Sequence, residues 1–320
     1  MIEAILTFLL VLLIIVIVIL PNLAEKSKQL RIILYLSLAG LGGLFMSFGI
    51  LSLLSSIVYD DPNPGMNMTI MGPGMFITGI FVTIIPFRYT RKIFAKFIPI
   101  NPDSAVHTGG IVFAFIMIGM SLTMMFSMDP AAFFSDSSMQ VTEVDLIAQS
   151  LFLTLIAFVG VGIFIRRTPG ECIKRLGLTM PTPKYILIGI AATVVFLAFT
   201  ISYEFIINYF FREALSNADE AMNAMFKNPT ILIILAVSLG AGISEEILFR
   251  GAIQPKFGLI FTAFLFAVIH FHYFTMFAIF ELFIVGILLG ILRIKTNTTT
   301  CIITHSGYNL AVFALILFSF

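Results

Sequence analysis

Two adjacent glutamates and an arginine stand inside an apolar stretch of the chain, at Glu245, Glu246 and Arg250. The stretch begins near Ile231 and otherwise reads as a membrane span, where ionisable side chains are costly and usually mark a functional site. Glu246 and Arg250 are four residues apart, so on a helix they share a face and can form an ion pair. Glu245 lies about 100° from Glu246 and stays free to accept a proton, as a general base that activates water must do. The three residues can also be a structural charge cluster.

Two later stretches carry polar side chains at helical spacing. Phe266 and His270 are one helical turn apart, and His305 and Asn309 are again separated by four residues. A neutral imidazole beside an amide suits the stabilisation of an oxyanion, although either motif alone could serve interhelical hydrogen bonding. His272 is expected beyond the end of its helix and outside the site.

The depths of these residues in the membrane indicate that they belong together. Counted from the flanking cytoplasmic basic residue at ~1.5 Å per residue, Glu245 lies roughly 16 Å deep and His270 roughly 21 Å deep. By the same count, His305 and Asn309 lie roughly 15 and 21 Å deep. Four residues on three spans therefore converge on one layer near the middle of the membrane, which predicts a single site.

The elements that position these side chains are predicted to be membrane helices. The chain has 59% hydrophobic and 11% charged residues, against about 45–50% and ~25% in typical soluble domains. Its continuous uncharged runs predict an all-α, polytopic transmembrane helical bundle rather than a barrel of alternating strands. We predict about ten spans, of which the short eighth could form a tight pair with the seventh. The spans are roughly residues 3–20, 32–58, 68–87, 108–128, 146–165, 185–211, 229–253, 257–271, 277–293 and 297–318.

The basic residues predict the orientation, because Lys and Arg concentrate in cytoplasmic loops. With the N-terminus outside, all of the 18 Lys and Arg residues except Arg212 and Lys227 fall on the cytoplasmic side. We therefore predict a multi-pass protein of the cell membrane whose site opens toward the cytoplasm. Glu204 and Glu281 then fall near the outer ends of their spans, as interface residues or, alternatively, as parts of an outer cavity.

A polar segment at residues 166–184 divides the chain into two predicted regions. Residues 1–165 form a five-span membrane region of unknown role, in which Gly40, Gly42 and Gly43 are expected to be helix-packing positions. Residues 166–320 form the C-terminal domain, which carries all the intramembrane polar chemistry on a core of catalytic helices.

The chain resembles the CPBP family in three motifs that occur in the family's order. This family comprises the CAAX proteases and bacteriocin-processing enzymes, including the type II CAAX prenyl endopeptidases of the endoplasmic reticulum. The motifs are Glu245-Glu246-x-x-x-Arg250, Phe266-x-x-x-His270 and His305-x-x-x-Asn309. Residues 175–178 and 290–300 also look like family segments, so that the resemblance covers about 170–318.

The resemblance implies a CAAX-type intramembrane endopeptidase in which Glu245 and His270 activate water. It also implies that His305 and Asn309 support the oxyanion. The supporting residues would be Glu246, Arg250 and Phe266. The expected partners are the lipid bilayer and a membrane-associated peptide or protein substrate, of which a prenylated CAAX substrate is one option. No nucleic-acid partner is expected.

Three alternatives stay open. The protein could be a transporter in which the buried glutamate and histidine residues form a proton relay, or a non-catalytic scaffold that binds other membrane proteins. A metal is also compatible with these residue types, because His270, His305 and Glu245 could form a His₂Glu zinc site. The sequence does not separate such a site from metal-free water held by the same side chains, and we favour a mechanism that requires no cofactor.

Overall fold

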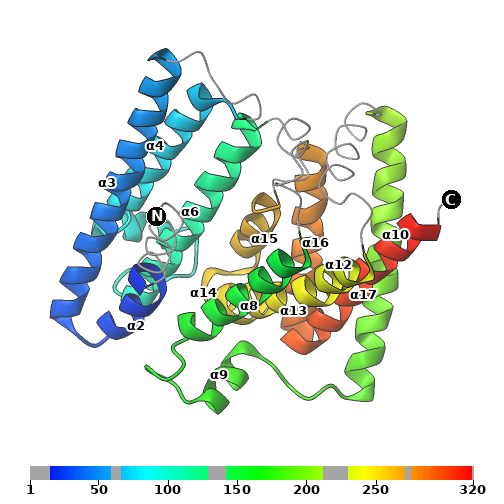
Figure 1. The fold of residues 1–320 in the computed structure, drawn as a ribbon. Coiled ribbons are helices and arrows are strands. Elements are labelled where there is room, and N and C mark those ends of the chain that lie inside the picture. Colours follow the sequence, from blue (N-terminus) through cyan, green and yellow to red (C-terminus); the bar gives the residue numbers. More distant parts are fainter. Residues whose placement is uncertain (1–14, 59–65, 129–141, 212–229, 271–274, 319–320) are drawn as a thin grey trace. The chain divides into compact units, whose positions relative to one another are not determined.

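The structure is a computed structural model that describes residues 15–58, 66–128, 142–211, 230–270 and 275–318. These residues form helices and their connections, with two isolated β-bridges and no sheet among them (Figure 1), which confirms the all-α prediction. The helices other than the one that carries the two glutamates are η1 Ile15–Ile19, α2 Leu20–Ala24, α3 Lys28–Val58, α4 Met68–Ile84, α5 Arg88–Phe94, α6 Ala105–Ser127, α8 Glu143–Gly160, α9 Pro169–Leu176, α10 Pro183–Phe210, α15 Leu259–Val268, α16 Met276–Lys295 and α17 Thr298–Phe318.

Polar residues at helix starts explain where several of these helices begin. An N-terminal backbone N–H group has no partner within its own helix, and a Ser, Thr or Asn side chain just before the helix can accept its hydrogen bond. Side-chain oxygens do so at the starts of α4, α6, α10 and α16, and at the start of α12 Ile231–Leu235. The capping residues are Asn67, Ser104, Thr182, Thr275 and Thr230.

Six of the described helices are long and apolar enough to cross a membrane, or seven if α4 and α5, which are bent by 104°, count as one span. The predicted number of about ten spans is not confirmed. Most of predicted span 3–20 lies outside the described residues, and α15 has only 10 residues, fewer than a crossing requires. Helix α17 is not among the six.

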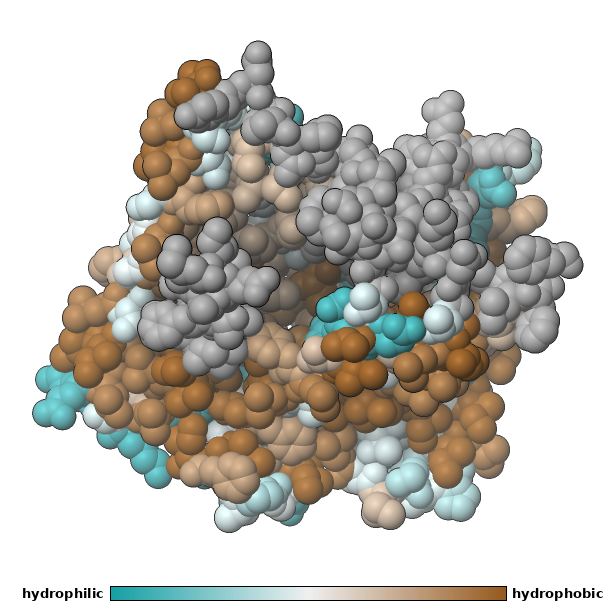
Figure 2. Space-filling model, in the orientation of Figure 1, coloured by the Kyte–Doolittle hydropathy of each residue, from teal (hydrophilic) through white to brown (hydrophobic). Residues whose placement is uncertain are grey.

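The surfaces of these helices are those of a protein surrounded by lipid. Large apolar side chains are exposed along α3 and α10, including Leu36 (69%), Leu51 (64%), Leu187 (67%) and Phe205 (73%). Hydrophobic residues cover most of the face shown in Figure 2, and hydrophilic residues gather there in small groups. Apolar exposure on this scale is unusual for a soluble monomer and is expected of membrane helices.

The chain forms two compact units, and the predicted domain boundary at residues 165/166 remains a prediction. The first unit comprises residues 1–128, 158–172 and 256–258, and the second comprises residues 129–157, 173–255 and 259–320. In the first unit α3 packs closely on α4, because a Cβ built at Gly42 would lie 2.6 Å from the Gly79 carbonyl oxygen. The packing role predicted for Gly42 is therefore confirmed. It is wrong for Gly40 and Gly43, where no described atom lies within 4 Å of a built Cβ.

The first unit also contains a buried arginine that is bound by neutral groups. Arg91, in α5, is 4% exposed. Its Nη1 donates to the Tyr35 hydroxyl at 2.6 Å and to Thr108 Oγ1 at 2.8 Å. Its guanidinium also stacks on the Tyr35 ring at 4.8 Å from the ring centroid. Arg91 therefore ties α5 to α3 and α6.

The second unit is built around residues 231–255 of the helix that carries the two glutamates, Ile231–Phe257, which we call the glutamate helix. It changes hydrogen-bond pattern along its length, through α12 Ile231–Leu235, the π-helical η3 Ala236–Ala241, α13 Gly242–Glu245, the π-helical η4 Glu246–Ile253 and α14 Gln254–Phe257. Single π-helical turns inside α-helices occur frequently at functional sites. Helices α10, α16 and α17 enclose an apolar core in this unit, formed by Phe196, Val285, Leu289 and Cys301.

Candidate active site

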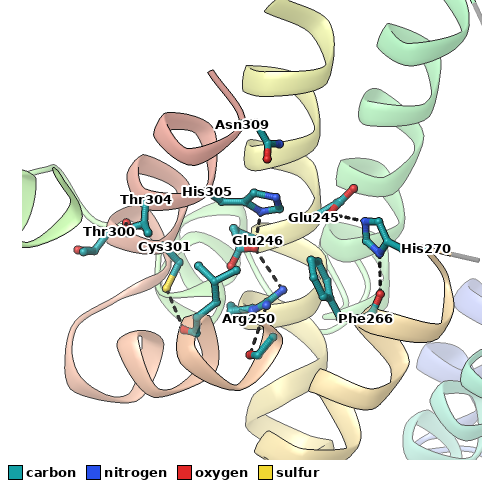
Figure 3. A network of polar contacts seen from close by, with 12 residues as sticks. Glu245, Glu246, Arg250, Phe266, His270, Thr300, Cys301, Thr304, His305 and Asn309 are labelled. Carbon is teal, nitrogen blue, oxygen red and sulfur yellow. Dashed lines mark hydrogen bonds and ion pairs between the residues drawn. The ribbon is translucent and has the colours of Figure 1, made fainter. Parts of the chain in front are cut away.

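Glu246 is the centre of a fully buried ion cluster. Arg250 Nη1 lies 3.2 Å from Glu246 Oε1, and the two side chains are 1% and 0% exposed, respectively. His305 Nδ1, which comes from α17, lies 2.8 Å from the same Glu246 oxygen (Figure 3). The pairing predicted from the Glu246–Arg250 spacing is confirmed. The contact is one-point rather than two-point, because Glu246 Oε2 has no partner among the described residues.

The bond between His305 and Glu246 fixes which ring nitrogen carries a hydrogen. A carboxylate can only accept a hydrogen bond, so Nδ1 of His305 is the donor to Glu246. Nε2 of His305 then carries a lone pair and can only accept when the ring is neutral. It can donate only when the ring is protonated. The neutral imidazole expected from the sequence could therefore not donate to an oxyanion.

Glu245 and His270 form a second, looser pair. His270 Nε2 lies 3.7 Å from Glu245 Oε2, which is too long for a direct hydrogen bond. His270 Nδ1 lies 2.6 Å from the Phe266 carbonyl oxygen, which can only accept, so Nδ1 carries the hydrogen and Nε2 of the neutral ring is a lone pair. Two acceptor atoms at this separation can both be reached by the hydrogens of one water molecule.

The Phe266 ring separates the two pairs. The ring is 1% exposed, and the Arg250 guanidinium carbon lies 4.4 Å from its centroid. The His270 and His305 rings lie 4.6 and 6.0 Å from the same centroid (Figure 3). Phe266 therefore fills the space between the Glu246 cluster and the Glu245–His270 pair, and it keeps the two carboxylates in different surroundings.

The last predicted site residue, Asn309, lies one turn beyond His305 on α17. Its Nδ2 is 3.5 Å from the Val237 carbonyl oxygen, at the limit of a hydrogen bond, and Val237 belongs to η3. The close approach of α17 to the glutamate helix depends on Gly242, where a built Cβ would lie 2.3 Å from Ser306 Oγ. The structure thus brings all seven predicted residues together, on the glutamate helix, on α15 and the turn that follows it, and on α17.

Residues 227–311 match one protein-family model, and this segment contains all of these side chains. The family is type II CAAX prenyl endopeptidase Rce1-like. The match confirms the resemblance to the CAAX proteases for this part of the chain, and it does not extend to residues 1–226. The comparisons found no match among curated proteins or solved structures.

Sequence reasoning missed three features of the site in the Rce1-like segment. Ser238, Ser244 and Ser306 each bury a side-chain oxygen that has no hydrogen-bond partner among the described residues. Buried polar groups of this kind commonly bind ordered water. The only sequence signal was their position beside the motifs, since a serine in a membrane helix usually bonds to its own backbone.

The other polar residues considered at the sequence level lie elsewhere or outside the description. Glu204 is exposed on α10, and Glu281 is partly buried on α16. His272 lies outside the described residues. The zinc alternative needs three ligands, but within the described parts of the chain no group of three His, Cys, Asp or Glu side chains is placed to hold a metal ion.

Proposed function

We propose that this protein is an intramembrane endopeptidase that hydrolyses a peptide bond of a membrane-associated substrate. The observation that carries the proposal is the Glu245–His270 pair, in which a carboxylate oxygen and a ring nitrogen face each other at 3.7 Å. Glu245 Oε2 is buried and has no hydrogen-bond partner among the described residues. The match to the Rce1-like family supports the same reaction class.

Glu245 and His270 would activate the water molecule. Water that donates one hydrogen to Glu245 and the other to His270 Nε2 directs its lone pairs toward the substrate carbonyl carbon. As the new C–O bond forms, one proton passes to Glu245 and the carbonyl electron pair moves onto its oxygen. When the C–N bond breaks, its electron pair stays on nitrogen, which takes the proton from Glu245.

His305 and Asn309 would stabilise the oxyanion, provided that the His305 ring is protonated. Because Nδ1 of His305 donates to Glu246, the ring offers a second N–H only as an imidazolium. Glu246 would then lie between two cations, the His305 imidazolium and the Arg250 guanidinium. The cluster would carry one net positive charge next to the developing oxyanion. The Asn309 amide supplies a second donor, and preorganised donors of this kind are worth ~10²–10³ in kcat.

A substrate-trapping comparison tests the reaction and identifies the substrate class. Membrane proteomes of cells that produce the wild type are compared with those of cells that produce Glu245→Gln. An uncleaved precursor should accumulate with Glu245→Gln, and a prenylated C-terminus on that precursor would place it in the CAAX class. The control is Glu171→Gln, an exposed glutamate of α9. Identical proteomes for the wild type and Glu245→Gln would contradict the proposal.

The proposal also places the N-terminus outside and opens the site toward the cytoplasm. Cys172 is a poor probe of this orientation, because it is fully buried and burial raises the pKa of its thiol. Instead, an impermeant thiol reagent is applied to intact cells that carry either Thr142→Cys or Glu171→Cys in a cysteine-free background, since both positions are exposed. Only Thr142→Cys should be labelled, and labelling of Glu171→Cys alone would invert the topology.

A further inference from the structure

A polar contact joins α17 to α10 beside the proposed site. The hydroxyl oxygens of Thr200, on α10, and Tyr308, on α17, are 2.9 Å apart, and Thr200 is only 6% exposed. Tyr308 immediately precedes Asn309 in the sequence. This hydrogen bond therefore holds α10 to the turn of α17 that carries a residue of the proposed site.

The hydrogen bond between Thr200 and Tyr308 is the second of two ties between α17 and α10. One turn earlier, Thr304 Oγ1 donates to the Gly189 carbonyl at 3.1 Å, and Thr193 Oγ1 donates to the Thr304 carbonyl at 3.2 Å. The Tyr308 ring also packs edge-on against Phe196, with a centroid separation of 6.5 Å. Each tie lies one residue before a site residue of α17, Thr304 before His305 and Tyr308 before Asn309.

We propose that Thr200 and Tyr308 are positioning residues, which fix the rotation of α17 and so aim Asn309 at the site. The role in catalysis rests on the proposed function. A ~20° rotation of α17 would move each Cα, at ~2.3 Å from the axis, by ~0.8 Å and the side-chain tips further. A displacement of ~1 Å can cost ~10²-fold in rate.

Substitutions that remove single oxygens test this role in the purified full chain. Tyr308→Phe keeps the ring against Phe196, and Thr200→Val keeps the volume of the side chain. Each should lower kcat about tenfold, equivalent to one lost hydrogen bond, with little change in KM. Thr200→Ser should restore kcat. The control is Ser202→Ala on the same helix, whose hydroxyl bonds only to the Ala198 carbonyl of its own helix.

Two further measurements separate positioning from a general loss of stability. In the Asn309→Ala background, Tyr308→Phe should have no additional effect on kcat, because its effect acts through Asn309. Amide hydrogen exchange at residues 304–310 should rise in both Tyr308→Phe and Thr200→Val, whatever reaction the protein catalyses. Additive effects with Asn309→Ala, or unchanged exchange in these variants, would overturn the inference. If exchange rises in the two variants but the wild type shows no peptidase activity, the proposed function is refuted and the tie between α10 and α17 stands.

Discussion

Among the described residues, each compact unit has one fully buried arginine, and the two arginines have different surroundings. Arg91 of the first unit is bound by the hydroxyls of Tyr35 and Thr108. Arg250 of the second unit is bound by the Glu246 carboxylate, with His305 on the same oxygen. Each guanidinium also lies over an aromatic ring, of Tyr35 and Phe266, respectively. Burial of a charge is therefore not what distinguishes the candidate active site.

What distinguishes the second unit is that two further groups capable of acid–base chemistry, Glu245 and His270, lie beside its ion pair. Arg250 and Glu246 balance each other, and next to them stand a second carboxylate and a histidine whose facing atoms do not bond each other directly. Among the described residues, Arg91 bonds to two hydroxyls, and its guanidinium ties α5 to α3 and α6. An intramembrane ion pair therefore indicates function when a second carboxylate and a histidine lie next to it.

The largest effects are expected from removing the histidines of the second unit. His270→Ala removes one of two groups that hold the water, and His305→Ala removes an oxyanion donor, so each should lower kcat by ~10²–10⁴-fold. Arg91→Gln, in the first unit, should leave kcat within about twofold. Cleavage of a membrane-anchored peptide by the purified protein is the measurement.

The same assay with a metal chelator sharpens the interpretation of the histidines. The water-only mechanism predicts full activity after exhaustive chelation. Loss of activity on chelation and its return with zinc would instead indicate that the histidines act as ligands. His272→Ala should retain most of the activity, and inactivation equal to that of His270→Ala would give the second histidine a role in the site.

A smaller effect, on the free energy of unfolding, should separate the two arginines. Arg250→Gln leaves the Glu246 carboxylate buried without its cationic partner, a change that costs ~3–5 kcal/mol. Arg91→Gln leaves only two hydroxyls without a charged donor, so the expected cost is ~1–3 kcal/mol. Thermal unfolding of both variants in the same detergent compares them directly. Equal destabilisation would contradict the distinction between a charge-paired and a hydroxyl-bound arginine.

The local features of the site could be predicted from the sequence. The spacing of Glu246 and Arg250 places both on one helix face whatever surrounds them, because helix geometry sets it. Depth counting grouped Glu245 with the two histidines for the same reason, since the rise per residue is fixed. These arguments need only one helix at a time.

Features that depend on how helices meet could not be predicted. The bond from His305 to Glu246 joins α17 to the glutamate helix, and no spacing in the sequence encodes it. Arg91 was counted as a loop residue because Lys and Arg are usually solvated there, yet α5 turns it inward onto Tyr35. The predicted number of spans is not confirmed, because apolar composition does not separate a crossing from a short buried helix such as α15.

The central claim is that the two adjacent glutamates have different roles, and exchanging each for glutamine tests it most directly. Turnover and thermal stability are measured on the same preparations of Glu245→Gln and Glu246→Gln. Glu245→Gln should be as stable as the wild type with almost no turnover, because only the base is lost. Glu246→Gln should be the less stable protein, because Arg250 remains buried without its counter-charge. A stable, inactive Glu246→Gln together with an active Glu245→Gln would exchange the two roles and contradict the account.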